Sequence, residues 1–155
     1  MATKNAPTLL QIKMTCRHVI ELRKTGMTEN IAIRLLEQLT NMYGKFRVLG
    51  HVSPDHADQF DHWSKAARKA KAANLKGKYG LYLRVEHGTP RRDFAREVLA
   101  TYKKGKLTKG WMDRHCKRKW KIAVITHDED LRLNKLKRET YSSPDKRWAA
   151  AKIEF

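Results

Sequence analysis

The chain has 155 residues, 41% of them hydrophobic, which suits one compact domain with a real core and excludes general disorder. Its 34 Lys and Arg outnumber 16 Asp and Glu, so the formal net charge is +18, with +7 over residues 1–77 and +11 over residues 78–155. No apolar run approaches the roughly 20 residues of a membrane-spanning helix, and the N-terminus has no secretory signal, so we expect a cytoplasmic protein that binds a polyanion and no membrane.

The first predicted helix covers LLQIKMTCRHVIEL, residues 9–22, because its apolar residues recur at helical spacing. Thr8 precedes this helix and Gly26 ends it. Cys16 lies on its apolar face, and the second cysteine, Cys116, lies in a later helical segment. Neither has a partner at Cys-x-x-Cys spacing, so we expect two reduced thiols, with a disulfide between them as the alternative.

A second helix is predicted over ENIAIRLLEQLTNMYG, residues 29–44, with Thr28 as its N-cap and Gly44 as its end. The residues expected to form its buried stripe are Ile31, Leu35, Leu39 and Met42. The next segment, KFRVLG, is predicted to be a short strand or an irregular link.

A third helix is predicted from Ser53-Pro54-Asp55, a typical helix start, to about Asn74. The stretch HVSPDHADQFDHW gathers His and Asp residues, and three of them, Asp55, Asp58 and His62, would share one helix face. Such a face can bind a metal ion, although the spacing matches no known zinc mechanism. We favour the simpler interpretation, in which acids in the first half balance the helix dipole and the basic second half.

The second half of the chain mixes strands with helices. In LYLRVEH, apolar residues alternate with more polar ones, which predicts a half-buried strand. Leu81, Leu83 and Val85 would lie on one face, and Tyr82, Arg84 and Glu86 on the other. Helices are predicted over PRRDFAREVLATYKKG and TKGWMDRHCKRKW, followed by a β-branched strand, KIAVI. The strand enters a helix, THDEDLRLNKLKRE, opened by a capping box of Thr126 and Glu129, and Ser143-Pro144-Asp145 starts a last helix.

These elements predict an α+β fold, a mostly α single domain with a small strand–helix unit in its C-terminal half. Residues 1–77 would form its helical part, and residues 78–155 the part with strands, helices and the candidate site.

The segment RVEHGTPRRDF places Glu86 and His87 at a strand end, and THDEDLRLN opens a helix after the second strand. These segments resemble the motif of HNH, or ββα-metal, nucleases, in which an acid and a His are followed by Pro three residues later and by a His or acid early in a helix. The resemblance implies His87 as the general base that takes a proton from water. It also implies Glu86 and Asp130 as ligands of a divalent Mg²⁺ or Mn²⁺ ion, with His127 as the substitute for Asp130.

The same residues have a simpler interpretation. Glu86 and His87 would end an edge strand and face water, Pro90 would start the next helix, and the acids after Thr126 would favour a helix N-terminus electrostatically. The capping box would then need no metal ion to explain it.

Basic residues cluster on the predicted helix after Ser53, in the Arg pair after Pro90 and around TKGWMDRHCKRKWK. Their density predicts phosphate contacts from Lys65, Arg68, Lys69, Lys71, Arg91, Arg92, Lys106, Lys109, Arg114, Lys117, Arg118, Lys119 and Lys121. Trp111 and Trp120 lie among these residues and would either stack on bases or fill the core.

The predicted function is nucleic-acid binding, to DNA rather than RNA, and the resemblance sharpens this to a metal-dependent DNA endonuclease. The first alternative is a non-catalytic DNA- or RNA-binding regulatory or accessory protein. The second is a binder of an acidic protein, whose affinity would depend less steeply on salt. The oligomeric state stays open, with a dimer as one option.

Overall fold

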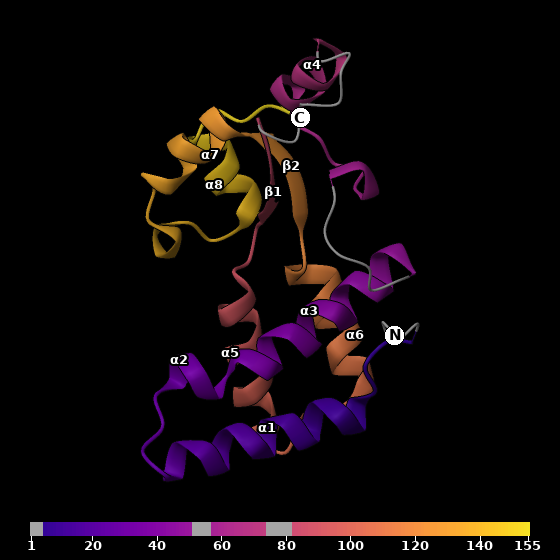
Figure 1. Cartoon of the computed structure of the whole chain (residues 1–155), viewed down its shortest axis with the longest axis vertical. Coiled ribbons are helices and arrows are strands. Elements are labelled where there is room, and N and C mark those ends of the chain that lie inside the picture. Colours follow the sequence, from indigo (N-terminus) through magenta and orange to yellow (C-terminus); the bar gives the residue numbers. More distant parts are fainter. Residues whose placement is uncertain (1–4, 51–56, 74–81) are drawn as a thin grey trace. The chain divides into compact units, whose positions relative to one another are not determined.

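A computed structural model describes residues 5–50, 57–73 and 82–155 and shows a mostly helical protein with one two-stranded antiparallel sheet (Figure 1). The predicted α+β class is therefore confirmed. The chain divides into two compact units, each made of two stretches: unit 1 is Met1–Ser53 with Thr89–Trp120, and unit 2 is Pro54–Gly88 with Lys121–Phe155. The predicted boundary between residues 77 and 78 lies outside the described residues, and a single domain stays a prediction.

Unit 1 is helical. Its elements are α1 (Leu9–Lys24), α2 (Glu29–Ala32), α3 (Arg34–Leu49), α5 (Arg91–Lys103) and α6 (Lys109–Lys119). Helix α3 packs against α1, α5 and α6, which makes it the central element of this unit. The buried side chains between these helices include Ile12, Val19, Leu36, Val98 and Met112.

The start of α1 is the one predicted, and a capping box fixes it. The Thr8 hydroxyl accepts a hydrogen bond from the Gln11 backbone N–H at 3.1 Å, and the Gln11 side chain accepts one from the Thr8 N–H at 2.8 Å. Cys16 and Cys116 are both buried and free, and burial raises the pKa of each thiol to about 12. The prediction of two reduced thiols is confirmed.

The helix predicted over residues 29–44 begins at Glu29 after Thr28, as predicted, but its continuity and its end were wrong. The helix is interrupted at Ile33 and then continues to Leu49, so the segment predicted as a strand or link is helical. Gly44 does not end it, because this residue is buried inside α3 against the Trp120 indole, where a Cβ would lie 2.6 Å from the ring carbon Cγ. Gly50, with φ +75°, ends the helix instead.

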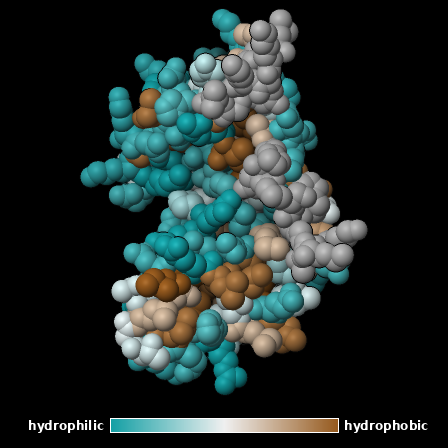
Figure 2. All heavy atoms as spheres, viewed as in Figure 1, coloured by the Kyte–Doolittle hydropathy of each residue, from teal (hydrophilic) through white to brown (hydrophobic). Residues whose placement is uncertain are grey.

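The buried face of α3 also differs from the predicted stripe. Ile31 is 60% exposed and Leu35 is 51% exposed, and Figure 2 shows hydrophobic side chains on the surface of α1 to α3. Thr40 and Tyr43 are buried in their place, since the Thr40 hydroxyl donates to the Leu36 carbonyl at 2.7 Å and the Tyr43 hydroxyl to Asp113 at 2.6 Å. Polar side chains that find such partners can occupy a core face.

Unit 2 is built on the sheet. Strands β1 (Leu83–His87) and β2 (Ile122–Thr126) are antiparallel, with Leu83 opposite Thr126 and His87 opposite Ile122. Helix α7 (His127–Asn134) packs on both strands. The remaining elements are two 3₁₀ turns (Ala57–Gln59 and Arg138–Thr140), α4 (Lys65–Ala73) and α8 (Pro144–Ala150). Its core includes a cluster of buried residues, Ala123, Ile125, Leu133, Trp148, Ala151 and Ile153.

The continuous helix predicted from residue 54 to about residue 74 was wrong over residues 60–64. The backbone there pairs with β2: the Val124 N–H donates to the His62 carbonyl, and the Ser64 N–H donates to the Val124 carbonyl, each at 2.9 Å. Helix α4 begins only at Lys65, with the Ser64 hydroxyl accepting from the Ala67 N–H at 3.0 Å. The predicted helix start, and with it Asp55 of the His and Asp cluster, lies outside the described residues.

The two predicted helix starts after β2 are confirmed. Thr126 and Glu129 form the capping box of α7, and Ser143 caps α8 with Pro144 in its first turn. The buried Glu129 carboxylate also accepts a hydrogen bond from the Ser64 hydroxyl at 2.6 Å, which explains why an acid is tolerated inside this unit. None of the helices within the described ranges is long and apolar enough to cross a bilayer.

Candidate functional site

Glu86, the residue that raised the question of a metal site, is buried, with its side chain 11% exposed. Its Oε1 lies 3.0 Å from Nη2 of Arg138 and 3.5 Å from Nη1 of Arg147. The prediction that Glu86 faces water with the polar side of the strand was therefore wrong. Two arginines from a segment more than fifty residues later hold it inside unit 2.

The two arginines also hold backbone carbonyls. Nη1 of Arg138 donates to the carbonyls of His87 and Gly88, both at 3.1 Å, and Nη2 of Arg147 donates to the Leu133 carbonyl at 2.7 Å. Arg138 thus attaches the C-terminal end of β1 to the 3₁₀ turn Arg138–Thr140, and Arg147 attaches α8 to α7. We refer to Glu86, Arg138 and Arg147 as the Glu86 cluster, and its contacts are those of a structural anchor.

The charges of the Glu86 cluster compensate one another. Burial raises the pKa of the Glu86 carboxyl, and the positive charges of Arg138 and Arg147 oppose that shift. The negative charge of Asp130 raises the Glu86 pKa further, so Asp130 lies within electrostatic range of the cluster. Burial likewise lowers the pKa of the Arg147 guanidinium. Each buried charge is thus tolerated only because its partners are present.

Of the other predicted nuclease residues, Asp130 lies within electrostatic range of Glu86, but His87 and His127 do not join them. Side chains of neighbouring strand residues point to opposite faces, so Glu86 and His87 point apart. The exposed His127 follows the other end of the ladder, where its N–H donates to the Tyr82 carbonyl, roughly 17 Å along the strands from His87. Across residues 5–50, 57–73 and 82–155, no three His, Cys, Asp or Glu side chains could hold one metal ion. The metal and base roles stay predictions without support from this geometry.

About half of the predicted phosphate contacts are cations that already face an acid. The ion pairs are Lys65–Glu154 at 3.1 Å, Lys71–Asp58 at 2.7 Å, Arg92–Glu37 at 2.6 Å, Lys109–Asp113 at 2.8 Å, Lys119–Glu97 at 4.0 Å and Lys121–Asp145 at 2.6 Å. Arg91 is exposed at the first residue of α5. A paired cation gains less from a phosphate, because it must first give up its carboxylate.

The other predicted contacts are exposed and have no carboxylate within ion-pair distance among the residues that the structure describes. They are Arg68 and Lys69 in unit 2, and Lys106, Arg114, Lys117 and Arg118 in unit 1. Arg114, Lys117 and Arg118 stand at i, i+3 and i+4 on α6 and therefore share one helix face. We refer to these three residues as the α6 cation row.

The opposite face of α6 explains why the cation row points outward. Met112, His115 and Cys116 are buried there, and the His115 ring lies 4.4 Å from the Trp111 ring and 4.5 Å from the Phe94 ring, measured between centroids. Burial, with smaller contributions from nearby cations, lowers the His115 pKa to about 4, so this imidazole is neutral at pH 7. Because the inner face of α6 is apolar and aromatic, the cations of this helix lie on its outer face.

The two tryptophans near the cation row were predicted either to stack on bases or to fill the core. Trp120 is buried against Gly44, and its indole N–H donates to the Asn41 side chain at 3.1 Å, so it belongs to the core. Trp111 is half-buried and stacks on His115. Both side chains support α6 from within.

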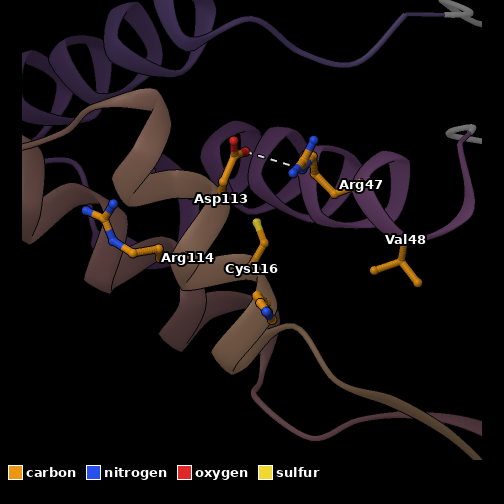
Figure 3. A pocket seen from close by; sticks show the side chains of 6 residues that line it. Arg47, Val48, Asp113, Arg114 and Cys116 are labelled. Atoms are coloured by element: carbon orange, nitrogen blue, oxygen red, sulfur yellow. Dashed lines mark ion pairs between the residues drawn. The ribbon is translucent and has the colours of Figure 1, made fainter.

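A cavity of about 340 Å³ lies beside the cation row, between the end of α3 and α6 (Figure 3). Its lining residues are Arg47, Val48, Asp113, Arg114, Cys116 and Lys117. Asp113 accepts hydrogen bonds from the Tyr43 hydroxyl at 2.6 Å and from Lys109 at 2.8 Å, and it pairs with Nε of Arg47 at 3.3 Å. Arg47 and Val48 were not among the predicted site residues, because KFRVLG was predicted as a strand or link; a helix extended past Gly44 would have placed them on α3.

No protein-family model matches this chain, and neither does any curated protein or solved structure. The class that the structure defines is a basic, mostly helical α+β protein with a row of exposed cations on α6.

Proposed function

We propose that this protein binds nucleic acid through the α6 cation row. The observation that carries the proposal is that Arg114, Lys117 and Arg118 lie exposed on one helix face without a carboxylate within ion-pair distance in the described part of the chain. Neighbours at this spacing have Cβ atoms about 5–6 Å apart, so the three charges form one continuous positive strip. Phosphates that such cations neutralise release condensed counterions, which favours binding.

DNA is the expected partner, and RNA is the alternative that the same phosphate contacts would accept. We propose no cleavage step. The Glu86 carboxylate already engages Arg138 and Arg147, and a ligand of Mg²⁺ or Mn²⁺ would have to leave the half-buried Arg138 and the buried Arg147 without their acid. The geometry therefore supports the non-catalytic alternative better than an endonuclease.

The proposal is tested by measuring affinity for a labelled DNA oligonucleotide by fluorescence anisotropy at fixed salt. The variant carries Arg114→Ala, Lys117→Ala and Arg118→Ala, and the matched control carries Lys135→Ala, Lys137→Ala and Lys146→Ala, three exposed cations of unit 2. Both proteins lose three positive charges, so the comparison separates position from net charge. We expect at least about a tenfold loss of affinity for the α6 variant and a smaller loss for the control.

Equal losses in the two variants would overturn the proposal, because binding would then follow net charge alone. If the protein bound polyglutamate, a model of an acidic polypeptide, and bound neither DNA nor RNA under the same conditions, the alternative of an acidic protein partner would instead be established. The circular dichroism spectra of both variants should match that of the unchanged protein, since the substituted side chains are exposed.

A further inference from the structure

The cavity beside the α6 cation row combines an apolar interior with a positive rim, and nucleic-acid binding through phosphates alone does not explain it. We infer that it receives an unpaired base of the bound strand, while the neighbouring phosphates lie on the cation row. This inference rests on the proposed function and deepens it, because it makes a strand with unpaired bases the preferred ligand.

The cavity has the size and polarity that a base requires. Its volume, about 340 Å³, lies at the lower end of the range of small-ligand pockets. Val48, which is 60% exposed, and the Cys116 side chain form apolar parts of its lining (Figure 3). The Cys116 pKa, raised to about 12 by burial, keeps the thiol neutral at pH 7. A planar, weakly polar ring would cover this surface without leaving a buried charge unpaired.

Arg47 supplies a flat surface on which a base can stack. Its Nε lies 3.3 Å from Oδ1 of Asp113, which restricts the orientation of the guanidinium plane (Figure 3). Asp113 is itself held by Lys109 and the Tyr43 hydroxyl, and hydrogen bonds from these two groups lower its pKa, so it stays ionised. Guanidinium planes stack on aromatic rings, and an orientation fixed in advance reduces the entropy lost on binding.

Two cations belong to both the cavity and the cation row. Arg114 and Lys117 line the cavity and are exposed on the outer face of α6, so a base inside would have its own phosphates beside them. Asp113 does not oppose this arrangement, because Lys109 and Arg47 compensate its charge. The ligand class that fits is an anion joined to a planar ring, which is a nucleotide unit of a single strand. A duplex would first have to unstack a base, which costs a few kcal/mol.

The experiment compares three labelled ligands: a single strand of about 12 nucleotides, the same strand with abasic sites at its centre, and the matching duplex. The proteins are the unchanged chain, Arg47→Ala, and Arg17→Ala as the control that removes an exposed arginine from α1. We expect the unchanged protein to bind the intact strand about tenfold more tightly than the abasic strand. Arg47→Ala should lose most of this preference while its affinity for the abasic strand changes less than about twofold, and Arg17→Ala should keep the preference.

The outcomes separate the inference from the proposed function. Equal affinity of the unchanged protein for intact and abasic strands, or an equal loss on both strands in Arg47→Ala, would overturn the cavity as a base site. Binding through the cation row would still stand if the triple α6 variant bound both strands more weakly. If no strand and no duplex bound at all, the proposed function would fail together with the inference.

Discussion

Arginines in two regions of this molecule serve different purposes. In the Glu86 cluster of unit 2, Arg138 is half-buried and Arg147 is buried, and both face one carboxylate and several backbone carbonyls. In the α6 cation row of unit 1, Arg114 and Arg118 are exposed and face no carboxylate among the described residues. Residue type is the same in both regions, so the difference lies in which acid the fold brings near.

This difference changes what a high positive charge implies. The +18 of the chain is not one uniform surface, because many of its cations are engaged within the fold. A cation that already faces a buried carboxylate contributes to stability, and its removal leaves that carboxylate unpaired. A cation without an acid contributes little to stability and is available to a partner. Substitutions in the two regions should therefore have opposite consequences.

The largest effect is expected from Glu86→Ala. This change leaves Arg138 and Arg147 without their carboxylate inside unit 2, so the free energy of unfolding should fall by about 3 kcal/mol or more. Urea unfolding followed by circular dichroism measures the loss, with Glu139→Ala, an exposed acid, as the control. A loss below about 1 kcal/mol, the value typical of a surface ion pair, would mean that the cluster is not an anchor.

The second effect concerns the support of α6 by α3. Gly44→Ala places a methyl group against the Trp120 ring, 2.6 Å from its Cγ, and should destabilise unit 1 by about 1–3 kcal/mol. Gly110→Ala is the matched control, because there the new methyl group meets only the flexible end of Arg114 at 3.3 Å. Alanine favours a helix over glycine, so the control should be slightly more stable. Thermal unfolding of both variants should therefore show shifts of opposite sign.

The third effect is a dependence on pH from His115. Its pKa is lowered to about 4 in the folded protein, against 6.5 when exposed, so the unfolded chain binds the proton first as the pH falls. Stability is therefore full above pH 6.5 and is lost toward pH 4, by about 2 kcal/mol at pH 5. Urea unfolding at pH 7 and pH 5 measures this. His115→Phe, which keeps an aromatic ring between Phe94 and Trp111, should remove this part of the dependence; an unchanged dependence would assign it to other groups.

The smallest expected effect is from His87→Ala in a test for cleavage. Glu86 and His87 point apart, and His127 lies at the other end of the ladder. Supercoiled plasmid incubated with either the unchanged protein or His87→Ala should therefore stay intact in Mg²⁺, Mn²⁺ or EDTA. DNA binding should be the same in His87→Ala as in the unchanged protein. Metal-dependent nicking that disappears in this variant would instead establish the nuclease site that the sequence resemblance predicts.

Local signals in the sequence predicted the helix starts and the sheet well. Thr8, Thr126 and Ser143 each act as N-caps where expected, since a cap depends only on residues within one turn. The two strands are also close to their predicted positions, because β-branched and alternating residues define them within a few positions.

What the sequence could not give depends on residues far apart in the chain. From the local sequence, Gly44 is a typical helix end, but in the fold Trp120 packs on it and the helix continues. Glu86 has the pattern of an exposed strand residue, but in the fold Arg138 and Arg147 contact its carboxylate and bury it. The break before α4 follows from backbone pairing with Val124, which no pattern around residues 60–64 encodes. The candidate cavity was missed for the same reason, since it forms only where α3 meets α6.

The most direct test of the account is the salt dependence of DNA binding. The logarithm of the binding constant is measured against the logarithm of the salt concentration for the unchanged protein, the triple α6 variant and the triple unit 2 control. If Arg114, Lys117 and Arg118 each neutralise a phosphate, the slope of the α6 variant should be smaller in magnitude by about 2–3 for duplex or single-stranded DNA, while the control keeps the original slope. Identical slopes for all three proteins would contradict the claim that the α6 cation row holds the nucleic acid.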